Sequence, residues 1–111
     1  MALTIARVAG ADYTEANKRV RVRDVTFDSS YPTDGESLTA ADVGLRKIEQ
    51  AIPHGVAVNT AATSAVAVHY DRTNSKLLAF ETGDTVSTVL DEVGNTESLD
   101  TYSVRMTFIG Y

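Results

Sequence analysis

The chain of 111 residues contains no cysteine and no tryptophan, and it has only two prolines. Without cysteine it can form neither a disulfide framework nor a thiolate metal site, and it has no cysteine nucleophile. No apolar run approaches the roughly 20 residues that a membrane-spanning helix needs. The first charge, at Arg7, comes where a secretory signal would carry its apolar stretch. We therefore expect no export signal, and folding in a reducing cytoplasm.

Basic side chains are outnumbered, because 10 Lys and Arg against 15 Asp and Glu give a net charge of −5. The excess of acidic residues is greatest in the C-terminal third. Such a surface repels phosphate, so we expect neither a nucleic acid nor an anionic membrane as partner. The length and the ordinary apolar content predict one globular domain with a single core.

Residues that favour strands are abundant, since Val, Ile and Thr together make up more than a quarter of the chain. The clearest strand is the last one, from Tyr102 to Phe108, where apolar and polar residues alternate with a period of two. Alternation also predicts the following strands: Ala65 to Tyr70 with Val66, Val68 and Tyr70 inward, Lys76 to Glu81 with Leu78 and Phe80 inward, and Leu45 to Ile52 with Ile48 and Ile52 inward.

A further strand is predicted from Lys18 to Phe27, where three arginines alternate with apolar residues. The apolar parity changes after Val22, so we expect a bulge near Arg23 that keeps both halves of the strand facing the core. A period of two places Arg19, Arg21 and Arg23 on one sheet face. These arginines either pair with acidic residues on neighbouring strands or bind carboxylates of a partner protein.

Two segments depart from the strand pattern. Between residues 39 and 44, Thr39 can cap the following amides, Asp42 can bond back to it, and Gly44 can end the turn, which predicts one short helical turn. The segment Thr85 to Val93 has helical spacing but a β-branched composition, and we favour a strand. The expected fold is all-β, a single-domain β-sandwich of jelly-roll character over residues 18–111.

Residues 1–17 precede this domain as an N-terminal arm or extended segment. Leu3, Ile5 and Val8 are its apolar residues. The segment is either a frayed terminus or an arm that adds a strand to the sheet edge of another subunit.

Residues that carry chemistry do not form a recognisable catalytic, cofactor or metal motif, so we expect no enzyme, no cofactor, no metal site and no small-molecule substrate. His54 and His69 are interpreted as two solvated histidines. Asp28, Asp34 and Glu36 lie within one loop and could offer oxygens to calcium, but their spacing lacks the regular ligands of an EF-hand. We interpret them as turn-forming acids in a solvated loop.

Three stretches resemble small β-rich head proteins of tailed bacteriophages, of the capsid decoration or cement type. They are Val25 to Leu45, including Asp28-Ser29-Ser30-Tyr31-Pro32-Thr33-Asp34-Gly35, then Tyr70 to Phe80, then Glu92-Val93 through Phe108-Ile109-Gly110-Tyr111. The resemblance covers about half the chain. It implies a non-enzymatic virion protein on the outside of the head, commonly a homotrimer, whose partner is the major capsid protein and which stabilises the coat lattice.

Under this interpretation the contacts with the shell or a neighbouring subunit come from Leu3, Ile5 and Val8 of the arm and from the ladder of Arg19, Arg21 and Arg23. Other virion parts of the same build, such as a tail or fibre adaptor, are an alternative. A sugar- or receptor-binding β-sandwich is another, because five tyrosines could supply an exposed aromatic platform. An enzyme is the least favoured.

Overall fold

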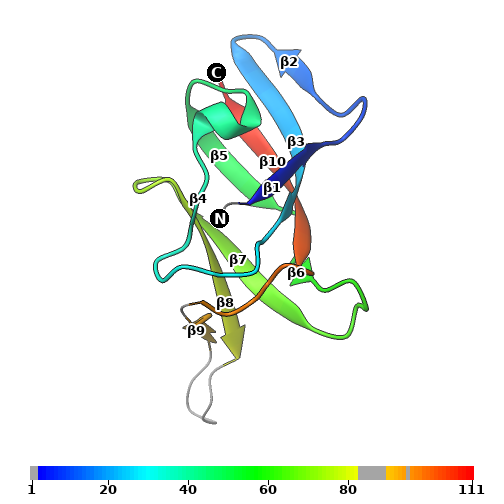
Figure 1. Ribbon diagram of the computed structural model, residues 1–111. Helices are drawn as coiled ribbons and strands as arrows, with labels where there is room; N and C mark the ends of the chain where they lie inside the picture. The colour runs from blue at the N-terminus through cyan, green and yellow to red at the C-terminus, as the bar shows by residue number, and fades with distance from the viewer. Residues whose placement is uncertain (1–2, 83–89, 95) are drawn as a thin grey trace.

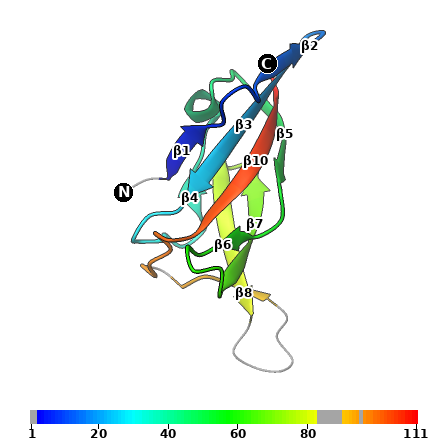
Figure 2. The same cartoon turned by 90° about the vertical axis from the view of Figure 1, so that its right-hand side faces the viewer.

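The computed structural model describes residues 3–82, 90–94 and 96–111. Its strands form one antiparallel sheet that curls on itself (Figures 1 and 2). The strands are β1 (Thr4–Arg7), β2 (Tyr13–Glu15), β3 (Lys18–Thr26), β4 (Glu36–Ser37), β5 (Ile48–Pro53), β6 (Ala57–Val58), β7 (Ala65–Asp71), β8 (Lys76–Thr82), β9 (Leu90–Glu92) and β10 (Ser103–Gly110). The expected all-β class is confirmed for the described residues, whereas the jelly-roll sandwich stays a prediction.

The sheet has two halves joined by a very short strand. In one half β10 lies between β3 and β5, with β1 and β2 on the far side of β3. In the other half β8 lies among β7, β4 and β9. β6 pairs with both β10 and β7, so the curl occurs there. It brings the ring of Tyr70 edge-on to that of Phe108, with centroids 6.5 Å apart.

The core fills the concave side of the curled sheet. β10 contributes three of its inward residues, Val104, Met106 and Phe108, as the alternation of its sequence predicts. The remaining buried apolar residues come from both halves and from the segments that close over them: Val25, Phe27, Tyr31, Leu38, Val43, Leu45, Ile48, Ala57, Val66, Leu77, Ala79, Val93 and Leu99.

Strand β3 is regular, and the bulge expected near Arg23 is absent. Its register with β10 runs without a shift from Thr26 to Arg19. The arginines therefore share the concave face with Val25, and Val20 lies on the convex face beside Ile109. The prediction was wrong because it assumed that apolar residues occupy only one face, whereas β2 and β10 give Val20 apolar neighbours on the other.

A bulge occurs instead in β5. The register with β10 shifts between Ile109, which faces Gln50, and Gly110, which faces Ile48. The extra residue reverses the parity of the strand. Ile48 is therefore buried as expected, but Ile52 is 45% exposed, so its inward placement was wrong.

The inward parity predicted for β8 was also wrong. Leu77 and Ala79 are buried in the core, and Leu78 and Phe80 are only partly buried on the other face. The sequence Leu77-Leu78-Ala79-Phe80 is apolar throughout, so its pattern does not select a face. The face is selected by the pairing of Leu77 with Tyr70 of β7.

The helical turn expected between residues 39 and 44 is confirmed as a 3₁₀ helix over Ala40–Val43. The Thr39 amide donates to Asp42 Oδ2 at 2.9 Å, and Gly44 ends the turn with φ 78°. Of the segment Thr85 to Val93, residues 85–89 lie outside the described residues. Leu90–Glu92 form β9, which agrees with the favoured strand.

Candidate functional site

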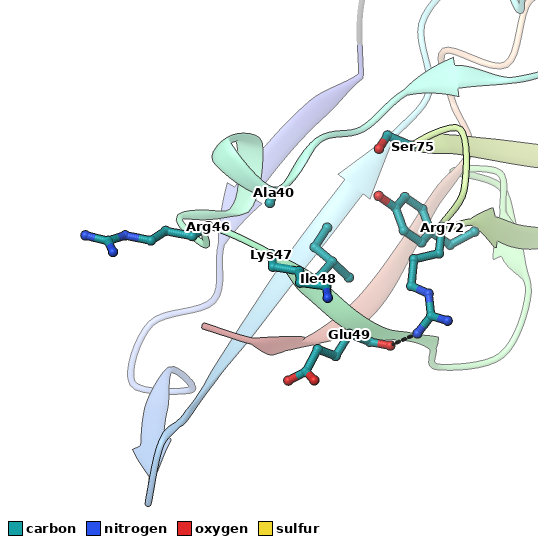
Figure 3. A pocket seen from close by; sticks show the side chains of 8 residues that line it. Ala40, Arg46, Lys47, Ile48, Glu49, Arg72 and Ser75 are labelled. Carbon is teal, nitrogen blue, oxygen red and sulfur yellow. Dashed lines mark hydrogen bonds between the residues drawn. The ribbon is translucent and has the colours of Figure 1, made fainter.

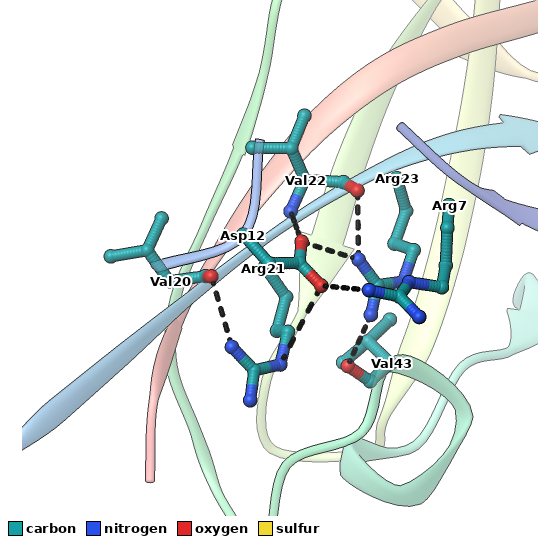
Figure 4. Close-up of polar contacts among 7 residues, drawn as sticks. All are labelled: Arg7, Asp12, Val20, Arg21, Val22, Arg23 and Val43. Atoms are coloured by element: carbon teal, nitrogen blue, oxygen red, sulfur yellow. Dashed lines mark hydrogen bonds and ion pairs between the residues drawn. The ribbon is translucent and has the colours of Figure 1, made fainter. Parts of the chain in front are cut away.

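Three arginines converge on one aspartate at the end of the concave face, where the short helix closes over β3. Arg21 and Arg23 come from β3, Arg7 from β1, and Asp12 from the connection between β1 and β2 (Figure 4). Arg23 Nη1 donates to Asp12 Oδ1 at 2.7 Å. Arg7 Nη2 and Arg21 Nε lie 3.7 Å and 3.9 Å from Asp12 Oδ2. We call these four residues the arginine cluster.

Neighbouring groups stabilise the ionised form of Asp12. The hydrogen bond from Arg23 is the main cause that lowers the pKa of Asp12 below its ordinary value, and burial opposes it. The amide of Val22, which donates to Oδ1 at 3.0 Å, and the charge of Arg21 lower this pKa further. Asp12 is therefore ionised at neutral pH, and the cluster holds three cations and one anion.

Arg23 also links β3 to the short helix. Its side chain is only 8% exposed. Nη1 donates to the carbonyl of Val22 at 2.8 Å, and Nη2 donates to the carbonyl of Val43 at 3.4 Å. Val43 is the last residue of the helix, where carbonyl groups lack partners within the helix. The cluster thus has a structural role, because it joins the N-terminal segment, β3 and the helix.

The three arginines of the ladder differ in their contacts. All three arginines share a face, as predicted, and Arg21 and Arg23 pair within the chain. Arg19 is exposed, and among the described residues its side chain makes no ion pair or hydrogen bond. Contact of any of the three with a partner protein stays a prediction.

The apolar residues of the expected arm lie against the chain's own sheet. β1 and β2 both pair with β3, and Ile5 faces Val25 in the register. Leu3 and Ile5 are partly buried against the core. The amide of Val8 donates to the carbonyl of Val22 at 3.4 Å. Addition of this segment to another subunit stays a prediction.

Two acidic residues are buried beneath the loop that follows β3. Asp28 is 7% exposed and Glu36 is 2% exposed, so their expected placement in a solvated loop was wrong. Asp28 Oδ2 and Glu36 Oε1 have no hydrogen-bond partner among the described residues. Burial first, and then the charge of Asp28 and a hydrogen bond with it, raise the pKa of Glu36 to about 7. A proton held between these carboxyl groups would satisfy both oxygens.

Tyr31 anchors the same loop to the rest of the chain. Its hydroxyl donates to Glu92 Oε2 at 2.8 Å and accepts the amide of Ala79 at 3.0 Å. The Tyr31 amide donates to the carbonyl of Glu97, and the Tyr31 carbonyl accepts from the amide of Thr96. Burial raises the pKa of Tyr31 above its ordinary value, so the hydroxyl stays protonated at neutral pH.

A cavity of about 420 Å³ lies between the short helix, β5 and the turn between β7 and β8 (Figure 3). Two of the polar residues that line it, Arg72 and Glu49, are already paired. Arg72 Nη1 donates to the carbonyl of Glu49 at 2.8 Å. The carboxylate of Glu49 pairs with Lys18, which lowers its pKa below the ordinary value. Arg46 points away from this cavity (Figure 3).

The sequence pattern did not identify Asp12, and the predicted solvated loop misplaced Asp28 and Glu36. Asp12 stands before the first strong strand and has no spacing that relates it to Arg23. Glu36 stands between Gly35 and Ser37, and neither neighbour gives a reason to expect a buried Glu.

No family model, curated protein or solved structure matches this chain. Within the described residues no group of three His, Asp or Glu side chains is arranged to hold a metal ion. None of the helices in this part of the chain is long and apolar enough to cross a membrane.

Proposed function

We propose that this chain is a non-enzymatic structural protein of a tailed-bacteriophage virion, a decoration or cement protein that binds the outside of the head and stabilises the coat lattice. Its partner is the major capsid protein, and it acts as a homotrimer after folding in the host cytoplasm. The jelly-roll character expected of such a module belongs to this proposal.

The observation that carries the proposal is the meeting of the three resembling stretches at Tyr31. This residue belongs to the first stretch, its hydroxyl accepts from Ala79 of the second, and it donates to Glu92 of the third. The first and second stretches also meet where the Tyr70 hydroxyl donates to the carbonyl of Leu38 at 2.8 Å. Segments far apart in sequence thus pack together. This supports the proposal, because stretches that resemble one family should belong to one folded unit.

The convex face offers a surface of the kind that binds protein. Tyr13 and Ile52 are 55% and 45% exposed, and both lie on this face over β2 and β5. Tyr111, at the end of β10, is 46% exposed. Tyrosine is among the residues that contribute much of the binding energy at protein interfaces. Three linked subunits would repeat this modest contact at high effective concentration, so no strong single site is needed.

Purified heads assembled without this protein provide the test. The protein should co-sediment with these heads and raise the temperature at which they release DNA. An equal amount of a Tyr13→Ser, Ile52→Ser variant, checked for unchanged folding by circular dichroism, should bind less. Failure of the wild-type protein to co-sediment, or equal thermal survival of heads with and without it, would refute the proposal. Binding to tails or fibres alone would favour the adaptor alternative.

A further inference from the structure

Arg21 has hydrogen-bond donors that none of the described residues accepts. Its side chain is only 18% exposed. Nη1 donates to the carbonyl of Val20 at 3.3 Å, and Nε lies 3.9 Å from Asp12 Oδ2, which is an ion pair but not a hydrogen bond. A guanidinium has five N–H groups. Most of those on Arg21 therefore have no partner among the described residues and must be satisfied by water or by a ligand.

These donors face a cavity of about 330 Å³ that is lined by Arg7, Asp12, Arg21, Arg23 and Gly44. Gly44 borders both guanidinium groups, because a Cβ atom there would lie 3.8 Å from Arg21 Nε and 3.8 Å from Arg23 Nη2. The left-handed φ of 78° favours glycine at this position.

The charges of the cavity are unbalanced. Asp12 is its one carboxylate, and Oδ1 of Asp12 already accepts hydrogen bonds from Val22 and Arg23. Two positive charges in excess favour an anion, and the fork of a guanidinium matches the two oxygens of a carboxylate. The chain as a whole carries a charge of −5, which disfavours a long polyanion such as nucleic acid.

The geometry points to a binding site for a single carboxylate side chain of a partner protein, held between Arg21 and Arg7 at the mouth of the arginine cluster. Arg23 and Asp12 hold the site in place, and their mutual bond keeps Arg23 from rotating toward the ligand. Arg7, whose side chain is 78% exposed, is free to close over the bound group. The site rests on the proposed function only for the identity of the partner, an acidic segment of the coat protein.

The experiment uses a blocked peptide of alternating Gly and Glu as the probe, and it observes the Nε–Hε resonances of the arginines by NMR. The Arg21 resonance should shift saturably as the peptide is added. A peptide with Gln in place of Glu should cause no shift. Arg21→Gln should weaken binding of the Glu peptide by about tenfold or more, because a hydrogen-bonded charge pair is lost.

Arg19→Gln is the matched control, since Arg19 lies on the same strand and face but outside the cavity. It should leave the affinity unchanged. Equal shifts at Arg19 and Arg21, equal loss in the two variants, or saturable binding of inorganic phosphate without binding of the Glu peptide would each overturn the inference. Peptide binding without head binding would refute only the proposed function, and head binding that Arg21→Gln leaves intact would refute the role of this site on the shell.

Discussion

The buried pair of Asp28 and Glu36 makes the stability of this protein depend on pH, and Glu36→Gln tests that dependence. Burial, followed by the charge of Asp28 and a hydrogen bond with it, raises the pKa of Glu36 from 4.5 to about 7, while nearby positive charges, Lys76 among them, oppose the rise. Each carboxyl group has an oxygen without a partner among the described residues. A proton on Glu36 therefore stabilises the folded structure.

The free energy of unfolding falls as the pH rises, because the folded and unfolded chains lose the proton of Glu36 at different pH values. Below pH 4.5 the folded and unfolded chains both carry the proton on Glu36, and its contribution to stability is complete. As the pH rises from 4.5 to about 7, the unfolded chain loses this proton first, so the free energy of unfolding falls. The rise of this pKa from 4.5 to about 7 means that the free energy of unfolding falls by about 3 kcal/mol by slightly alkaline pH.

Urea unfolding at several pH values between about 4 and 8 measures this loss. Wild-type protein should lose about 3 kcal/mol relative to Glu36→Gln over that range, because glutamine keeps a donor toward Asp28 without titrating.

The matched control is Glu15→Gln, at an exposed position of β2. It should keep the wild-type dependence on pH. Parallel stability curves for wild-type protein and Glu36→Gln would show that folding leaves the pKa of Glu36 unchanged, and would refute a proton on Glu36 that stabilises the folded chain.

Three further substitutions test the packing. Gly110→Ala should destabilise by about 3 kcal/mol or more in urea unfolding, because a Cβ there would clash with the carbonyl oxygen of Lys47, which directly precedes β5; a milder effect would contradict this close approach. Phe108→Ala should cost about 3 to 5 kcal/mol by the same assay, since its ring is fully buried against Tyr70. Tyr31→Phe should cost about 1 to 3 kcal/mol, as the Ala79 amide loses its partner, and unchanged stability would argue against Tyr31 as an anchor.

Local pattern was enough for the class of fold and for several elements. The alternation in β10 reports its inward face correctly, and the turn at Ala40–Val43 follows from its own capping residues. Such features depend on neighbours within a few residues, so the sequence contains the whole signal.

Only the folded chain decides which face of a strand is inward when both are partly covered, and which polar groups meet. Val20 is buried on the convex face because β2 and β10 flank it there, and the bulge in β5 turns Ile52 outward. Asp12 meets Arg23, and Asp28 meets Glu36, only after β1 folds onto β3 and β4 pairs with β8. Each contact depends on residues outside its own segment, so no local pattern predicts it.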